Sequence, residues 1–351
     1  MFRDYNNQDM IEQSPEYVRL SLAAAMTLKL IKGRFYRNAK LYCINILLTY
    51  AKGCTANCAY CGLSKLRPGD YKNKSFIRVA WPMFDTEIVV DKIKEREKDI
   101  KRVCISMITR RESVPDTIEV AKKIRKKTGV PISFLISPTV VLEKDFFAFL
   151  EAGADKVGIA IDAATPEIFC KHRGEEVNGP HKWDKYWRCF EKALKYFGEK
   201  NVGSHFVVGL GETEKEMVQA IQKVRNMGGE THLFSFFPEV NSKLEKHPRP
   251  PISVYRRIQM ARYLIDNDIV KFENMKFDDN DRIVDFGVNI EPYLAKGKPF
   301  MTSGCIGKDG EVACNRPYAN ERPSEEPRNF PFVPEDYEIE NIRKEIWQYT
   351  M

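Results

Sequence analysis

The chain has 351 residues, of which 43% are hydrophobic and 30% charged, the composition of a globular protein that can bury a large core. No stretch approaches the roughly 18 to 20 consecutive apolar residues of a membrane span, so we expect no membrane association. The net charge of +7 is compatible with an acidic protein partner. The basic run at residues 122–127 lacks the interleaved aromatic residues of a nucleic-acid-binding face, so we expect no nucleic-acid partner.

The predicted elements alternate between helix and strand from residue 14 onward. The first helix spans residues 14–31, with Ser14 as its N-cap and Pro15 at the first helical position. Beyond it, short apolar strands and amphipathic helices follow one another. The expected strands cover residues 42–48, 103–107, 132–136, 156–162, 202–209 and 231–237. The expected helices cover residues 85–97, 114–127, 143–152, 183–197, 213–227 and 253–266.

This alternation predicts an α/β fold with a parallel sheet that helices cover on both faces. We divide the chain into an N-terminal helical cover (1–41), a partial (β/α)6 barrel of the TIM type (42–267) and an irregular C-terminal extension (268–351). In such barrels the functional groups gather at the carboxyl ends of the strands. The loops that follow the predicted strands are therefore the places to search for a site.

The most informative of these loops, residues 53–62, directly follows the first strand. It places Cys54, Cys58 and Cys61 at the spacing C-x3-C-x2-C. Three neighbouring thiols cannot all pair, and nine cysteines without a secretory signal predict a reducing, cytoplasmic location. The spacing suits a metal that takes several soft thiolates, and three ligands leave one iron of a four-iron cluster open. A structural zinc loop with a distant fourth ligand is the alternative.

One strand end and the C-terminal tail supply further candidates. Asp162 ends the fourth strand and could accept the two ribose hydroxyls of a nucleotide, whereas a helix N-cap role belongs better to Thr165. Cys305 and Cys314 flank a glycine-rich turn and could form half of a second iron–sulfur cluster, or a structural lid. The remaining ligands would come from Ser303, Asn315, Arg316, Cys43 or Cys104. Free cysteines behave as small hydrophobic residues, so the default interpretation is a buried thiol for Cys104 and a core or surface thiol for Cys43.

The cysteine loop, with Tyr60 before its third cysteine, resembles the signature of the radical S-adenosylmethionine (SAM) enzymes. The turn after Asp162 and the run Gly209-Leu210-Gly211-Glu212-Thr213 resemble the biotin synthase and lipoyl synthase branch, and the Cys-Asn-Arg-Pro-Tyr tail is most similar to the two-protein, archaeal-type lipoyl synthases. The resemblance implies a [4Fe–4S] cluster on Cys54, Cys58 and Cys61, and SAM contacts from Tyr60, Asp162, Gly209, Gly211 and Glu212. Glu212 could instead serve only its own loop. We interpret the triplet at residues 228–230 as a helix C-cap, not as the family's contact to the methionine amine.

The resemblance implies radical SAM sulfur insertion. A 5′-deoxyadenosyl radical takes hydrogen from a protein-bound octanoyl chain, and a sulfur of an auxiliary cluster captures the carbon radical to form lipoyl. The implied partners are an octanoylated carrier protein or peptide, a companion radical SAM protein, and an electron donor such as ferredoxin or flavodoxin. The chain lacks the N-terminal C-x4-C-x5-C and C-terminal Arg-Ser-Ser-Tyr motifs of the common lipoyl synthase, so its sulfur-donating cluster must be held differently.

Two alternative functions stay open. One is another radical SAM reaction, such as a carbon-skeleton rearrangement or a biotin-synthase-like thiolation in cofactor or amino-acid biosynthesis. A rearrangement needs only one cluster, so the iron content separates it from sulfur insertion. The other is a non-catalytic zinc-loop module, for which the protein would carry no iron–sulfur chromophore.

Overall fold

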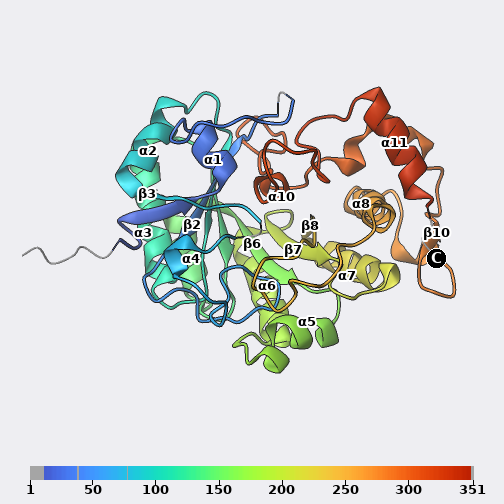
Figure 1. Ribbon diagram of the computed structural model, residues 1–351, viewed down its shortest axis with the longest axis horizontal. Helices are drawn as coiled ribbons and strands as arrows, with labels where there is room; N and C mark the ends of the chain where they lie inside the picture. Colours follow the sequence, from blue (N-terminus) through green and yellow to red (C-terminus); the bar gives the residue numbers. More distant parts are fainter. Residues whose placement is uncertain (1–11, 38, 77, 349–351) are drawn as a thin grey trace, which may run out of the picture.

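The structure is a computed structural model that describes residues 12–37, 39–76 and 78–348. Within these ranges a mostly parallel sheet is covered by helices (Figure 1). The sheet has the strand order β3-β1-β2-β4-β5-β6-β7-β8. The predicted α/β class with a partial barrel is therefore confirmed. Residues 1–11 of the predicted N-terminal cover lie outside the described ranges.

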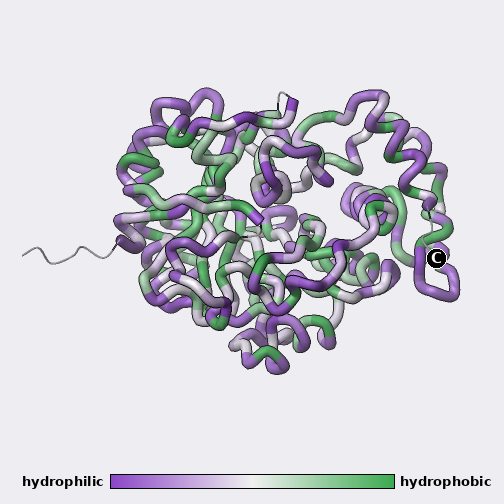
Figure 2. Tube along the Cα trace, viewed as in Figure 1, coloured by the Kyte–Doolittle hydropathy of each residue, from purple (hydrophilic) through white to green (hydrophobic). Residues whose placement is uncertain are grey.

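The six predicted parallel strands all form, and they pair in chain order. They are β2 (Cys43–Leu48), β4 (Arg102–Ser106), β5 (Ile132–Ile136), β6 (Ala154–Asp162), β7 (Val202–Val208) and β8 (Glu230–Ser235). Every residue of β2 and β4 is buried, as expected for strands with both faces covered. Figure 2 shows the hydrophobic residues concentrated in this central sheet.

Amphipathic helices follow the strands and bury one face against the sheet. They are α2 (Thr86–Glu95), α3 (Ser113–Lys127), α4 (Asp145–Glu151), α5 (Pro166–Arg173), α6 (Trp183–Phe197), α7 (Glu214–Asn226) and α8 (Ile252–Asp266). All were predicted within a few residues except α5, whose N-cap Thr165 was recognised but whose length was not. None of the helices in the described ranges is long and apolar enough to cross a membrane.

The predicted N-terminal helix over residues 14–31 is wrong in its first half. Residues Tyr17–Leu20 form strand β1, which pairs antiparallel with β2 on one side and with β3 (Met83–Asp85) on the other. The helix α1 (Leu22–Thr27) begins only after Ser21, whose hydroxyl accepts the backbone N–H of Ala24 at 3.1 Å. An unpaired edge on β2 would expose a row of backbone hydrogen-bonding groups, and β1 satisfies them. That pairing outweighs the local preference for helix.

The register of the sheet fixes which side chains face the barrel interior. Asn45 of β2 pairs with Cys104 of β4, and Cys43 lies two residues before Asn45. Because side chains alternate along a strand, Cys43 and Cys104 point to the same face. His205 of β7 pairs with His232 of β8, and both line a small cavity together with Cys104. The interior of the barrel is therefore rich in polar and thiol groups.

The C-terminal extension is a set of short elements that return along the barrel. These are β9 (Lys276–Phe277), β10 (Ile283–Asp285), α9 (Glu291–Lys296), α10 (Arg316–Ala319) and α11 (Asp336–Ile346). Helix α11 packs against α8. Arg257 of α8 joins the parts: its guanidinium donates to both oxygens of Glu214 on α7, at 2.6–3.1 Å, and to the carbonyl of Ile346 at 2.8 Å. The two side chains are 1% and 3% exposed.

We predict that Arg257→Met lowers the free energy of unfolding by about 3–5 kcal/mol, because it leaves the Glu214 carboxylate buried without its charged partner. Denaturant unfolding monitored by circular dichroism measures the change. The control is Arg343→Met, since Arg343 pairs with Glu291 at the surface and should contribute less than about 1 kcal/mol. Equal losses in the two variants would contradict a structural role for the buried pair.

Candidate active site

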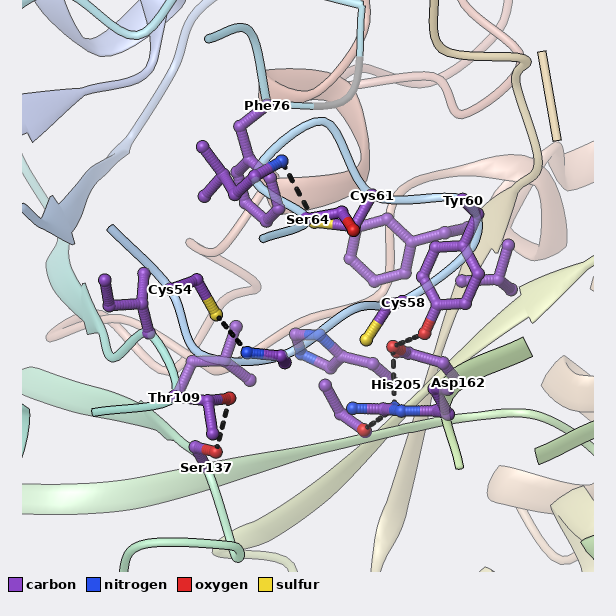
Figure 3. Close-up of a pocket in the computed structure, with 18 of the residues that line it drawn as sticks. Cys54, Cys58, Tyr60, Cys61, Ser64, Phe76, Thr109, Ser137, Asp162 and His205 are labelled. Atoms are coloured by element: carbon purple, nitrogen blue, oxygen red, sulfur yellow. Dashed lines mark hydrogen bonds and ion pairs between the residues drawn. The ribbon is translucent and has the colours of Figure 1, made fainter. Parts of the chain in front are cut away.

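The cysteine loop lies at the carboxyl ends of the parallel strands, where it closes over a cavity of about 160 Å³ (Figure 3). The backbone N–H of Thr55 donates to the carbonyl of Thr109, which ties the loop to the end of β4. The buried Asn57 side chain donates to the Val177 carbonyl at 2.6 Å and accepts from the Ser64 hydroxyl at 2.6 Å. Gly62 must be glycine, because a Cβ there would stand 2.2 Å from the carbonyl oxygen of Ser75.

The three predicted thiols, Cys54, Cys58 and Cys61, all line this cavity and none is in a disulfide. The backbone N–H groups of Ala56 and Leu63 each point at a thiol sulfur, of Cys54 and Cys61 respectively, at 3.4 Å. At Cys61 the N–H donor of Leu63 lowers the pKa and so favours the thiolate form.

Burial raises the pKa of two of the three thiols, Cys58 and Cys61. It raises the pKa of Cys58 to about 12 and that of Cys61 well above its ordinary value. A bound cation is what keeps buried thiols deprotonated, so the donor set fits a thiolate-ligated iron cluster. Within the described ranges, no group of three or more His, Cys, Asp or Glu side chains is arranged as it stands to hold one metal ion.

Asp162, the predicted ribose contact, lies at the end of β6 and lines the same cavity. Its backbone has a φ of +65°, a conformation that costs most residues free energy and that Asp tolerates better than bulky residues. The carboxylate accepts from the Tyr60 hydroxyl at 2.5 Å and from the Arg173 guanidinium at 2.8 Å. Thr165 caps α5, with its hydroxyl accepting the backbone N–H of Ile168 at 3.3 Å, so Asp162 is free of that role. Ribose binding by Asp162 stays a prediction.

The loop after β7 carries Gly209, Gly211 and Glu212, whose predicted contact with SAM stays a prediction. The Glu212 carboxylate accepts the backbone N–H groups of Gly209 at 2.6 Å and of Leu210 at 2.9 Å, so it braces its own loop. The carbonyl of Gly209 contacts the His247 ring at 2.9 Å. In the described structure, Gly209, Gly211 and Glu212 are not part of the cavity wall. The observed contacts of Glu212 are therefore those of a residue that holds its own loop, which is the alternative to a SAM contact.

Several residues of the cavity wall were missed from the sequence. The hydroxyls of Thr109 and Ser137, just beyond the ends of β4 and β5, lie 3.1 Å apart (Figure 3). Their positions just after apolar strands could have identified them. Arg173 was missed because α5 was not predicted, and its guanidinium also donates to the Tyr186 hydroxyl at 3.1 Å. His205 lines the wall from the middle of a strand, where no sequence pattern singles it out.

A second group of thiols gathers deeper in the barrel. Cys43, Cys104 and Cys314 form a buried cluster of their own, and Cys305 packs against it. Gly304 permits this approach, since a Cβ there would stand 2.1 Å from the Cys314 carbonyl oxygen. All four are free thiols. Cys43 and Cys104 are buried, as expected for core thiols, and the two tail cysteines lie beside them.

Arg316 lies between the two groups of thiols and lines both cavities. It is 2% exposed, and one guanidinium nitrogen, Nη1, donates to the Ser106 hydroxyl at 2.6 Å and faces the Cys104 sulfur at 3.9 Å. Its other terminal nitrogen, Nη2, has no hydrogen-bond partner in the described structure, and no carboxylate there pairs with the guanidinium. A buried cation without a carboxylate partner is costly unless nearby negative charge offsets it. Deprotonated thiols holding a cluster would supply that charge.

We predict that Glu212 gives the protein a pH-dependent stability. Burial raises the pKa of Glu212 to about 7, above its ordinary value of 4.5, so the folded state holds the proton more tightly than the unfolded state. The free energy of folding that protonated Glu212 contributes is therefore fully present below the ordinary pKa of the group. It is lost as the pH rises through about 7. Glu212→Gln should show a shallower fall in melting temperature between about pH 5 and pH 8 than the wild type.

At about pH 5 the variant should melt close to the wild type, because glutamine, like the protonated carboxyl of Glu212, offers one carbonyl oxygen to the backbone N–H groups of Gly209 and Leu210. Differential scanning calorimetry across the pH range measures both effects. The control is Glu151→Gln, an exposed residue at the end of α4. If the melting temperatures of wild type and Glu212→Gln change in parallel with pH, the Glu212 carboxyl is not the cause of the pH-dependent stability.

Comparisons with known proteins bear on the family and on the fold. Residues 48–224, half of the chain, match the family model described as the radical SAM superfamily. The structure resembles HydG, a maturase of the [FeFe]-hydrogenase, with a TM-score of 0.52 and 12% identity over 72% of this chain and 57% of that chain. Methylornithine synthase (PylB) shows 12% identity over 77% of this chain and 81% of its own, with a TM-score of 0.46.

The tryptophan-binding methyltransferase TsrM from Kitasatospora setae shows 12% identity over 79% of this chain and 56% of its own, with a TM-score of 0.40. No curated protein matches the chain. The likeness to HydG shows the fold alone, and this chain spans 57% of that protein's length. The match of the family model, which begins at the end of β2 and contains the cysteine loop, decides the family: the chain belongs to the radical SAM superfamily.

Proposed function

We propose that the chain is a sulfur-inserting enzyme that forms lipoyl from an octanoyl chain attached to a lysine of a carrier protein. One observation carries the proposal. Cys43, Cys104, Cys305 and Cys314 meet beside the cavity that the cysteine loop covers, and the two cavities share wall residues. Four thiols are a complete ligand set for an iron–sulfur cluster. A radical SAM reaction that only rearranges carbon would not need them.

The two cofactor sites have separate residues. Cys54, Cys58 and Cys61 would hold the [4Fe–4S] cluster, and Asp162 and Tyr60 would orient the nucleoside of SAM bound beside it. When bound, these groups and the second cluster supply a 5′-deoxyadenosyl radical that removes hydrogen from an unactivated carbon, and a sulfur atom that replaces it. The Asp162 carboxylate is held by Arg173, so its orientation is fixed before SAM arrives.

The walls of the cavity suit an acyl chain. Most of the exposed surface inside it is apolar, from residues at the ends of the parallel strands and the loops after them. Examples are Leu47, Met107, Ile108, Leu135, Val207 and Phe234. An apolar wall binds a hydrocarbon and excludes water, which protects a reactive radical from side reactions. The octanoyl chain would pass the cysteine loop and end toward Arg316 and the deeper thiols.

Further partners complete the proposal. Lipoyl carries two sulfurs, and a single second cluster in this chain would supply one of them, so a companion radical SAM protein would supply the other. A ferredoxin or flavodoxin would deliver the electron that the cysteine-loop cluster requires. These partners are expected to act in solution, with no membrane or nucleic acid involved.

We predict that the double variant Cys305→Ala/Cys314→Ala loses about four of about eight irons per chain, the content of one of two four-iron clusters. It should still convert SAM to 5′-deoxyadenosine, because Cys54, Cys58 and Cys61 remain. With an octanoyl-lysine peptide, the wild type should yield a product heavier by one sulfur atom and the variant should not. Anaerobic iron and sulfide analysis and mass spectrometry make the two measurements.

Cys189→Ala is the matched control, because Cys189 is a buried thiol on α6 away from both groups. It should keep the wild-type iron content and the sulfur product. About four irons in both wild type and double variant, with 5′-deoxyadenosine but no sulfur in the product, would reject sulfur insertion and favour a one-cluster radical SAM reaction.

We predict that Asp162→Asn weakens SAM binding about 10- to 100-fold, the effect expected when a hydrogen bond to a charged group is lost. The cluster content should not change, because Asp162 is not a ligand. Equilibrium dialysis with labelled SAM on anaerobic protein measures the affinity. Asp184→Asn, an exposed residue in the first turn of α6, is the control. Unchanged SAM affinity in Asp162→Asn would show that the carboxylate serves only Tyr60 and Arg173.

A further inference from the structure

Three arginines surround one aromatic ring at the edge of the active-site cavity. The guanidinium carbons of Arg249, Arg78 and Arg328 lie 3.7, 4.1 and 5.8 Å from the centroid of the Phe237 ring. Phe237 follows β8 and is itself part of the cavity wall. The three side chains come from segments far apart in the sequence, and the fold brings their charges together. We name Arg78, Arg249 and Arg328 the arginine rim.

The positive charge of the rim is only partly offset. Arg78 pairs with Glu325 at 2.8 Å, but that carboxylate is half-exposed and also pairs with Arg322. Arg328 donates to the Ser235 hydroxyl at 3.0 Å and to the Pro250 carbonyl at 2.8 Å. A second carboxylate nearby, Glu321, is buried and accepts hydrogen bonds from the backbone of Arg328 and from the side chain of Asn329.

Arg249 differs from its two neighbours. In the described structure it has no ion-pair or hydrogen-bond partner, although its ring contact with Phe237 is the shortest of the three. Partial burial, and then the charges of Arg328 and Arg78, lower the pKa of Arg249 to about 10. Like charges held this close favour the arrival of an anion, because an added negative charge relieves their repulsion. The rim is thus an incomplete anion site next to an apolar cavity.

We propose that the arginine rim binds acidic side chains of the carrier polypeptide on either side of its acylated lysine. This inference rests on the proposed function and names the part of the substrate that stays outside the cavity. An octanoyl-lysine side chain is long enough for the acyl end to enter the apolar cavity while the peptide backbone remains at the rim. Carboxylates on that backbone then meet Arg249, whose guanidinium is unpaired, and share Arg78 and Arg328.

The ligand is a protein carboxylate in this account for three reasons. The cavity behind the rim is apolar, which suits an acyl chain and not the stacked bases of a nucleic acid. The one aromatic ring at the rim is covered by guanidinium groups, so it offers no free face for base stacking. The overall charge of +7 also favours the approach of an acidic partner.

Binding of unreacting peptides tests the proposal. Two fluorescent octanoyl-lysine peptides are compared, one with aspartate and glutamate around the lysine and one with asparagine and glutamine at the same positions. Fluorescence anisotropy with the anaerobic, cluster-loaded protein, without reductant, measures the affinities. We expect the acidic peptide to bind about tenfold more tightly at low salt, and this preference to shrink as salt rises.

Variants assign the preference to the rim. Arg249→Glu should abolish it or reverse it, and Arg249→Lys should retain most of it because the charge is kept. Arg188→Glu makes the same charge change at an exposed position on α6 and should leave the preference intact. Equal affinities for both peptides, an equal loss in Arg188→Glu, or tighter binding of a single-stranded RNA oligonucleotide would overturn the proposal.

The unacylated forms of the same peptides separate this inference from the proposed function. If the rim binds acidic segments but the octanoyl group adds no affinity and no sulfur product forms, the proposed function is rejected. The proposal for the arginine rim is then retained. If octanoylated peptides bind and gain sulfur regardless of the flanking charge, the function stands and the rim proposal fails.

Discussion

The register of the parallel sheet is the constraint on which both groups of thiols depend. Strand β2 begins with Cys43 and leads into the loop that carries the Cys54 triplet, so one strand of six residues connects the two groups. Such a strand spans about 17–20 Å, which keeps the groups distinct. The pairing of Asn45 with Cys104 then places Cys104 on the same face as Cys43. A shift of one residue would turn either thiol away from the interior.

The C-terminal tail supplies the other two thiols of the group that contains Cys43 and Cys104. It returns to the barrel with Cys305 and Cys314 and closes a small cavity whose wall includes His205 and Arg316, residues that also line the larger cavity. The interior therefore holds a cation, several thiols and an apolar wall in two adjacent cavities that share wall residues. This combination explains why the barrel core contains polar groups that an ordinary hydrophobic core would exclude. It also places the proposed source of sulfur next to the proposed position of the acyl chain.

Much of the fold could be predicted because buried parallel strands appear in the sequence as continuous apolar segments. The helices between them show the hydrophobic periodicity of amphipathic helices. The Cys54 triplet and Asp162 were found because ligand spacing and strand-end position are local signals. The rest depends on contacts between distant residues. Strand β1 forms because β2 needs an edge partner, although its residues run directly into a helix. Cys43 and Cys104 meet Cys305 and Cys314 only because the tail returns to the barrel some 200 to 270 residues later, and no local sequence pattern predicts that contact.

The central claim is that two separate sets of thiols each hold iron. The most direct measurement is diffraction from anaerobically grown crystals on either side of the iron absorption edge. The account predicts two distinct anomalous peaks, one at Cys54, Cys58 and Cys61 and one within reach of Cys43, Cys104, Cys305 and Cys314. A single peak at the cysteine loop, with four protonated thiols at the second position, would contradict it.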